Sequence, residues 1–151
     1  MNEIILSAER YAVSPYLGHP EHHTKYLTSP KTDDSAIARA AVAASKERSC
    51  AAILVLTNHG TLPRLVAAYR PDIPIYAFCP SAKMGRQLQI YRGIHPIVGL
   101  KDVPQAKRAQ QAVADATAMG YIRSGDEVVV VAMEEDEVLG RTGLMKLVTV
   151  P

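Results

Sequence analysis

Short, continuously apolar runs alternate along the chain with helix-favouring segments, and this alternation limits the folds that the chain can adopt. The first run, Ala51 to Leu56, contains no polar residue, which is typical of a parallel strand covered by helices on both faces. The predicted strands cover residues 51–56, 75–78, 94–98, 128–132 and 144–150, and the predicted helices cover residues 33–48, 62–69, 82–91 and 105–119. This order predicts an α/β fold, a doubly wound, mostly parallel five-stranded sheet with helices on both faces and an antiparallel last strand at one edge.

Two segments fall outside this alternation. Residues Met1 to Val13 have apolar side chains at helical spacing and predict a short amphipathic helix. Residues Ser14 to Pro30 hold three prolines and three histidines, a composition that predicts a linker. We therefore expect an N-terminal helix and linker over residues 1–30 and an α/β domain over residues 31–151.

Composition excludes several classes of protein. The chain has 151 residues and is 48% hydrophobic, enough for one domain with a buried core. Its 17 basic and 15 acidic side chains form no single-sign block, so we expect no nucleic-acid partner. The apolar runs are far shorter than the roughly 18 residues of a membrane span, so we expect no membrane partner and a cytoplasmic location. Cys50 and Cys79 lie in apolar runs and are predicted to be reduced core residues.

Several sequence motifs, in a matching order and spacing, resemble the C-terminal regulatory α/β domain of pyruvate kinase. The most specific is R-Q-L at residues 86–88 followed by Y-R-G-I-H-P at residues 91–96. The other matching positions are Ala51–Thr57, Gly60, Tyr69–Pro71, Gly125, Asp126, Gly140, Thr142, Met145, and, near the start, Met1, Ile4, Ala8 and Glu9.

The resemblance implies a regulatory and assembly role rather than catalysis. In the family, Mg and K with ADP or ATP belong to a catalytic barrel, whose motifs do not occur in this sequence. Phosphoryl transfer needs metal ions and cationic groups around the moving phosphoryl group. We find no pair of carboxylates with a lysine that could replace the barrel's motifs. We therefore predict no catalytic residues, no metal site, no cofactor in this domain and no activity alone, with a separate catalytic barrel as a possible partner. The cluster His19, Glu21, His22 and His23 is interpreted as linker rather than as a zinc site.

The predicted binding site is the loop between the first strand and the next helix. A helix start at the carboxyl end of a parallel strand offers free N–H groups and a favourable dipole to an anion. In the resemblance this loop matches one that grips a phosphate of a sugar bisphosphate activator. Position 62, where the family has serine, is Leu62. The alternative is an ordinary turn with a glycine at positive φ. The predicted effector-binding residues are Thr57, Asn58, His59, Gly60 and Thr61.

The stretch from Glu134 to Gly143 is expected to be a loop between the last two strands. Its consecutive carboxylates, beginning at Glu134, would repel a bisphosphate, so we expect fructose bisphosphate to bind weakly or not at all. A solvated hairpin loop is one interpretation of the carboxylates. A cation-binding loop is the other, although the spacing of a calcium loop is missing.

The final strand is a candidate assembly surface. An apolar edge strand exposes unpaired backbone groups unless it is covered or paired, so we expect a homo-oligomer through Leu144 to Val150, supported by Met1 to Val13. Two other functions stay open. One is a stand-alone phosphometabolite- or nucleotide-binding module of the same fold, and the other is a small enzyme that uses His59 as its base.

Overall fold

The computed structural model describes residues 32–151 except 101, 137 and 139. The predicted helix over Met1 to Val13, the linker and the domain boundary after residue 30 lie outside the described residues. None of the described helices is long and apolar enough to cross a membrane.

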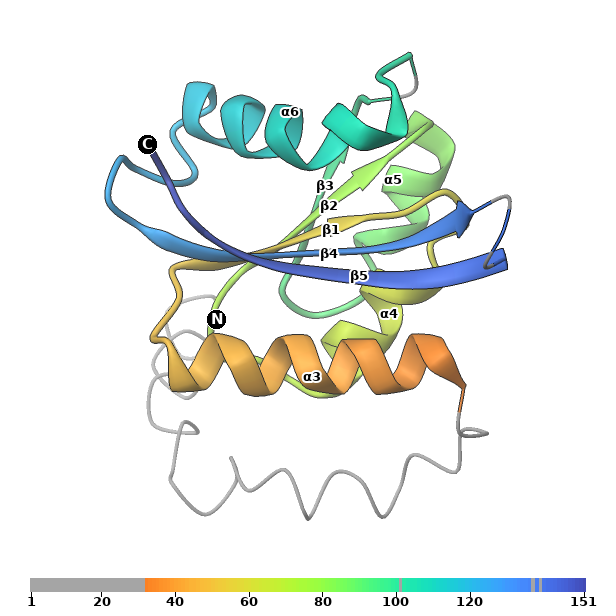
Figure 1. Cartoon of the computed structure of the whole chain (residues 1–151), viewed down its shortest axis with the longest axis horizontal. Coiled ribbons are helices and arrows are strands. Elements are labelled where there is room, and N and C mark those ends of the chain that lie inside the picture. The colour runs from red at the N-terminus through yellow and green to blue at the C-terminus, as the bar shows by residue number, and fades with distance from the viewer. Residues whose placement is uncertain (1–31, 101, 137, 139) are drawn as a thin grey trace, which may run out of the picture. The chain divides into compact units, whose positions relative to one another are not determined.

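The described elements follow the predicted order and form one sheet, β3-β2-β1-β4-β5 (Figure 1). The strands are β1 (Ala52–Leu56), β2 (Ile75–Cys79), β3 (Ile94–Val98), β4 (Glu127–Asp136) and β5 (Gly140–Thr149). The helices are α3 (Asp33–Glu47), α4 (Thr61–Ala68), α5 (Ala82–Leu88) and α6 (Gln105–Ala118). β1 pairs in parallel with β2 and β4, β2 pairs in parallel with β3, and β5 pairs antiparallel with β4. The predicted fold is confirmed.

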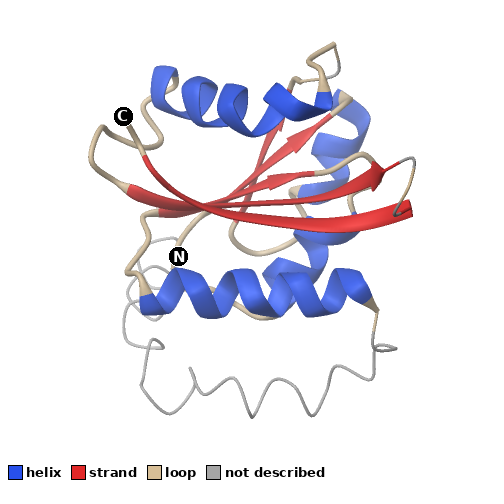
Figure 2. Cartoon of the chain, in the orientation of Figure 1, coloured by secondary structure: helices blue, strands red, loops and turns tan. Residues whose placement is uncertain are grey.

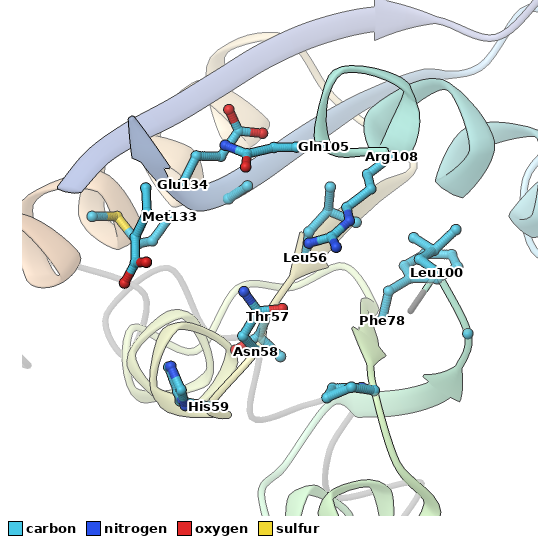
Figure 3. A pocket seen from close by; sticks show the side chains of 14 residues that line it. Leu56, Thr57, Asn58, His59, Phe78, Leu100, Gln105, Arg108, Met133 and Glu134 are labelled. Atoms are coloured by element: carbon cyan, nitrogen blue, oxygen red, sulfur yellow. The ribbon is translucent and has the colours of Figure 1, made fainter. Parts of the chain in front are cut away.

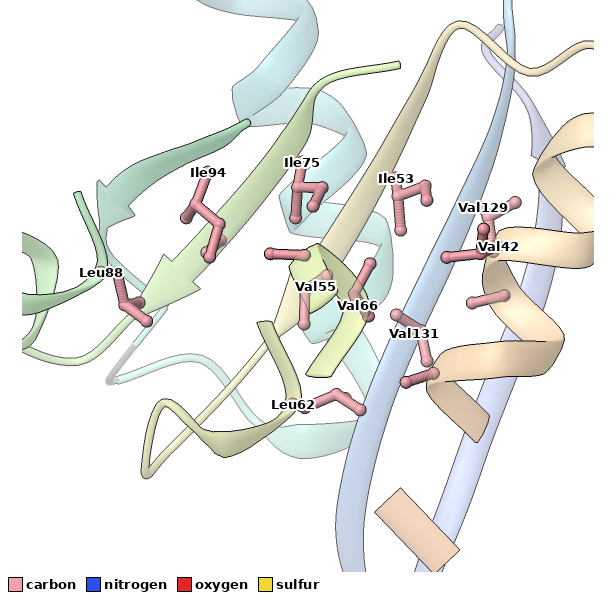
Figure 4. Packing of buried hydrophobic residues seen from close by; sticks show 14 of the residues in the cluster. Val42, Ile53, Val55, Leu62, Val66, Ile75, Leu88, Ile94, Val129 and Val131 are labelled. Carbon is pink, nitrogen blue, oxygen red and sulfur yellow. The ribbon is translucent and has the colours of Figure 1, made fainter. Parts of the chain in front are cut away.

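Helices cover both faces of the sheet (Figure 2). A buried cluster lies on each face, because successive side chains of a strand point to opposite faces. Ile53 and Val55 of β1 point to the face covered by α3, α4 and α5, where Val42, Val66 and Leu88 meet them (Figure 4). Leu54 and Leu56 point to the face covered by α6. Every β1 residue is buried, which explains why this strand has no polar position.

Helix α3 begins with a capping box. The Thr32 hydroxyl oxygen accepts a bond of 3.3 Å from the Ser35 N–H, and the Ser35 hydroxyl oxygen accepts one of 3.2 Å from the Thr32 N–H. Asp34 lies buried at the start of the helix, where it binds the side chain of Arg141.

The predicted loop over Glu134 to Gly143 is wrong. β4 continues to Asp136 and β5 begins at Gly140, with Glu134 opposite Thr142 and Glu135 opposite Arg141. Backbone pairing depends on the neighbouring strand and not on side-chain charge, so an acidic sequence can extend a hairpin whose side chains point away from the core. Glu134 and Glu135 are therefore held at fixed positions on a strand.

Candidate functional site

A cleft of about 340 Å³ opens at the carboxyl ends of the parallel strands (Figure 3). The chain passes from β1 outward to β2 and β3 and then returns to β4 on the other side of β1, so the strand order reverses between β1 and β4. Ligands of open α/β sheets bind at such a reversal. The lining comes from the ends of β1, β2 and β4, from the loop after β3 and from the first turns of α6.

The loop after β1 is held by its own hydroxyl group. The Thr57 Oγ1 atom accepts a hydrogen bond of 2.8 Å from the Gly60 N–H. Gly60 has φ of 80°, a conformation that L side chains rarely adopt, and it is buried beside Met84 and Leu88. Within the described residues no side chain caps α4, which starts at Thr61. The first N–H groups of this helix are therefore available to an acceptor from outside the chain.

The predicted loop residues divide between two adjoining hollows. Thr57, Asn58 and His59 line the cleft, and they also line a smaller recess of about 50 Å³, together with Thr61. Gly60 contributes backbone geometry rather than a side chain. Leu62 lines only the smaller recess, and its side chain is buried in the core with 3% of its surface exposed. The replacement of the family's serine by Leu62 therefore does not change the lining of the cleft.

Two residues of α6 were missed by the sequence analysis. Gln105 and Arg108 line the cleft, and Figure 3 shows Arg108 extending toward the end of β1. The Arg108 Nε–H donates a bond of 2.9 Å to the Val103 carbonyl, which orients the guanidinium. Among the residues that the structure describes, Arg108 has no ion-pair partner. The sequence signal that could have identified Arg108 is its position one turn into a helix that starts at the same edge of the sheet as the loop.

Carboxylates also line the cleft that contains Arg108. Along β4, Ala132 belongs to the cluster beneath α6, and alternation places Glu134 on the same side as Ala132 and Glu135 on the other side. Both glutamates line the cleft. Arg141, the cation that lies nearest in sequence to these carboxylates, donates a bond of 2.8 Å from its Nη2 to Asp34. Its charge is therefore already compensated.

The thiols supply no reactive group at this edge of the sheet. Cys50 and Cys79 are free and buried, as predicted. Burial raises the pKa of the Cys79 thiol, and the Sγ–H donates to the Ile97 carbonyl at 3.5 Å.

Leu100, on the cleft wall, has φ of 64°. A bulky residue in the left-handed region indicates local backbone strain, a feature that gathers at ligand sites.

Comparison with known proteins identifies the family. The model described as "Pyruvate kinase, alpha/beta domain" matches residues 35–148. The chain belongs to the pyruvate kinase family. It is 32% identical over 117 residues to a pyruvate kinase of Clostridium acetobutylicum, an alignment that covers 78% of this chain and 25% of that protein. It is 35% identical over 114 residues to pyruvate kinase 2 of a Synechocystis species, with 75% of this chain and 19% of that protein covered.

Solved pyruvate kinase structures agree with this assignment. The Cryptosporidium parvum pyruvate kinase in complex with ADP superposes with a TM-score of 0.74 and 30% identity, covering 85% of this chain and 26% of that one. A second crystal structure of a pyruvate kinase from Cryptosporidium parvum gives a TM-score of 0.75 with 26% identity, covering 93% of this chain and 27% of that one. The chain spans about a quarter of the length of the curated pyruvate kinases it matches first, and the matched part is their C-terminal α/β domain.

Proposed function

We propose that this chain is an effector-binding and assembly domain of a pyruvate kinase and that it has no phosphotransferase activity by itself. The effector is a phosphorylated small molecule whose phosphate lies beside Thr57, Asn58, His59, Gly60 and Thr61. One observation carries this proposal: the loop residues that lead into the uncapped start of α4, Thr57, Asn58 and His59, line the same cleft as Arg108, at the reversal of strand order.

The chemistry of these two groups favours a phosphate. Backbone N–H groups at a helix start bind anions through hydrogen bonds and the helix dipole. A guanidinium forms paired, charge-assisted hydrogen bonds with phosphate oxygens. Because the Arg108 Nε–H is already bound to Val103, its terminal nitrogens are the ones that would meet the ligand.

The proposed lack of catalysis rests on the side chains that are available to bind a metal ion. In the described part of the chain, no group of three His, Cys, Asp or Glu side chains could hold a metal ion. Phosphoryl transfer depends on metal ions that bridge the phosphates. We propose that Mg, K and ADP or ATP bind in a catalytic barrel that acts with this domain, and that the complex is cytoplasmic. The buried, unpaired thiols are compatible with a reducing compartment.

Calorimetric titration tests the phosphate site. We expect inorganic phosphate and sugar monophosphates to bind the parent chain, and Arg108→Gln to weaken binding by tenfold or more, about 1.4 kcal/mol. Arg123→Gln is the matched control, because Arg123 is exposed and precedes β4 at the opposite end of the sheet. Equal affinities of the parent chain and Arg108→Gln would contradict the site, and coupled-assay turnover by the chain alone would contradict the lack of catalysis.

The assembly role is supported by the exposed edge of β5. Among the described strands β5 pairs only with β4, and Met145 and Leu147 on it are 39% and 50% exposed. The Val150 N–H donates to the Asp126 carbonyl, so by alternation the N–H groups of Leu147 and Met145 point away from β4. Pairing of two β5 strands across a two-fold axis would satisfy these groups and cover the apolar side chains.

Light scattering of Leu147→Pro tests this interface. Proline removes an N–H that points outward, so the β4–β5 ladder is kept while pairing with a second copy is lost. We expect a homodimer for the parent chain at high micromolar concentration and a folded monomer for Leu147→Pro. Leu147→Thr is the control that keeps the N–H group. A parent chain that is monomeric, or a folded proline variant that keeps the dimer mass, would show that β5 is not the interface.

A further inference from the structure

The most specific motif of the sequence has no part in the proposed phosphate site. Its Arg86 lies on α5, and its Tyr91 follows this helix, which covers the face of the sheet opposite α6. Neither residue lines the cleft. Both side chains are exposed, so they are accessible to a molecule outside the described part of the chain.

Positive charges gather on the outer surface of α4 and α5. Leu88 of α5 points into the core (Figure 4), whereas Lys83 and Arg86 on the other side of this helix are exposed. Arg64 of α4 belongs to the same surface, because its Cζ atom lies over the Tyr91 ring, 5.3 Å from the ring centroid. The residues that we call the α4–α5 surface are Arg64, Lys83, Arg86, Ile90 and Tyr91.

No carboxylate of the described residues compensates these charges. The sequence has no acidic residue between Asp72 and Asp102, and the Asp72 carboxylate lies 3.8 Å from the Lys46 ammonium group of α3. Within the described residues, the three cations of the α4–α5 surface form no ion pair. Unpaired cations on one surface attract a partner of opposite charge and exclude partners of like charge.

An apolar side chain lies among the cations. Gln89 keeps a helical conformation at the end of α5, so Ile90 lies on the same side as Arg86, four residues earlier. Ile90 is 84% exposed. Arginine and tyrosine are enriched at the centres of protein–protein interfaces, where apolar side chains are buried by the partner. The α4–α5 surface therefore has the composition of a protein interface.

The neighbouring edge of the sheet is closed to strand addition. The Gly93 carbonyl accepts a hydrogen bond from the Ile75 N–H of β2, and the Gly99 N–H donates to the Cys79 carbonyl of β2. By alternation, the backbone of Pro96 in β3 faces away from β2, and proline has no N–H to offer a new strand. A partner on this side of the sheet is therefore bound through side chains.

We propose that the α4–α5 surface binds an acidic amphipathic segment of a partner protein, with carboxylates at the three cations and an apolar side chain on Ile90. This inference is independent of the proposed phosphate site. A nucleic acid fits less well, because bases stack on free aromatic rings and Arg64 already covers one face of Tyr91. A membrane fits less well, because one isoleucine and one tyrosine do not make the apolar face that inserts into lipid.

Fluorescence anisotropy with a labelled synthetic peptide tests this inference on the full chain. The probe is a helix-forming peptide with leucines on one face and glutamates beside them, and the control peptide has glutamine in place of each glutamate. We expect the acidic peptide to bind about tenfold more tightly than the control peptide. This difference should decrease between 0.05 and 0.5 M salt, because added ions screen exposed charges.

Variants of the chain separate the charged from the apolar contribution. Arg86→Glu should weaken binding of the acidic peptide about tenfold, and Lys83→Glu repeats the charge reversal one turn earlier. Ile90→Ser keeps every charge and should weaken binding of both peptides. Lys107→Glu is the matched control, because Lys107 is exposed on α6, on the opposite face of the sheet. Circular dichroism and denaturant unfolding check that each variant is folded.

The inference is wrong if the acidic peptide does not bind at high micromolar concentration, or if the two peptides bind equally. It is also wrong if Lys107→Glu weakens binding as much as Arg86→Glu. Duplex DNA or phosphatidylserine vesicles that bind more tightly than the peptide, and equally well to Ile90→Ser, would assign the surface to another class of partner. Arg108→Gln should leave peptide binding unchanged, so this inference and the phosphate site can fail separately.

Discussion

The two ends of the sheet treat their polar groups differently. At the amino end, Arg48 and Glu127 form a paired contact, with Nε to Oε2 at 3.0 Å and Nη2 to Oε1 at 2.6 Å. The hydrogen bond and charge of Glu127 raise the pKa of Arg48. At the carboxyl end, Arg108 and Glu134 have no such partners among the described residues, and no side chain caps α4. The amino end pairs its charges, whereas the carboxyl end pairs Arg141 with Asp34 and leaves Arg108 for the ligand that we propose.

The largest expected effect on stability comes from a change in backbone conformation at the carboxyl end of the sheet. Gly60→Ala should lower the free energy of unfolding by about 1–2 kcal/mol, because φ of 80° is strained for an L side chain. A Cβ atom there would meet Met84 at 3.6 Å, which is ordinary contact, so the cost comes from strain and not from overlap. Denaturant unfolding measures the change.

Gly99→Ala is the matched control for this variant. Gly99 also lines the cleft, its φ is not positive, and nothing lies within 4 Å of an added Cβ atom. We expect its stability to match that of the parent chain. A Gly60→Ala variant as stable as Gly99→Ala would mean that the loop does not depend on the left-handed conformation.

A smaller effect is expected from the hydroxyl group that holds the loop. Thr57→Val removes the acceptor of the Gly60 N–H bond and keeps the side-chain shape, so stability should fall by about 1 kcal/mol. Phosphate affinity should fall as well, since the loop loses its fixed geometry. Thr149→Val, on the exposed side of β5, should change neither quantity. Unchanged unfolding and unchanged phosphate titration of Thr57→Val would remove Thr57 from the site.

The two thiols sharpen the comparison because one lies near each end, Cys50 before β1 and Cys79 at the end of β2. Burial raises both pKa values in the folded protein, so the folded state retains protons that the unfolded state loses. Their contribution to stability is complete below the unfolded thiol pKa, about 8.5, and is lost as pH rises through the folded values.

We therefore expect stability to decrease as the pH rises above about 8.5. Chemical unfolding at pH 7.5, 8.5 and 9.5 measures this slope. Cys50→Ala and Cys79→Ala should each make the slope shallower. A slope that neither variant changes would assign the alkaline effect to other groups, such as Tyr76, whose pKa burial also raises.

The smallest effect is expected at the amino end. Arg48→Gln should reduce stability only slightly, since the Arg48 side chain is exposed and water and salt screen the pair. Phosphate binding should be unchanged. Unfolding experiments at 0.05 and 0.5 M salt should show the difference from the parent chain decreasing at high salt. A loss of phosphate affinity in Arg48→Gln would contradict the division of roles between the two ends.

The core was predictable from the sequence, whereas the cleft was predictable only in part. A run such as Ala51 to Leu56 specifies a strand buried on both faces, because each position must avoid polar atoms. The loop after it was located by the helix start that follows. Arg108 could not be assigned in the same way, because it reaches the loop only after the chain has passed through two further strands. The pairing of Arg141 with Asp34 joins residues 107 positions apart and leaves no local signal.

The β4–β5 hairpin lies at both the cleft and the proposed dimer edge, and this has a thermodynamic consequence. Its first strand carries Glu134 to the cleft, and its second carries Leu147 to the exposed edge. If ligand occupancy changes the self-association constant by some factor, association must change the ligand affinity by the same factor, because the two equilibria form a closed cycle. Measuring dimer dissociation with and without ligand would therefore give the same coupling free energy as measuring ligand affinity in monomer and dimer.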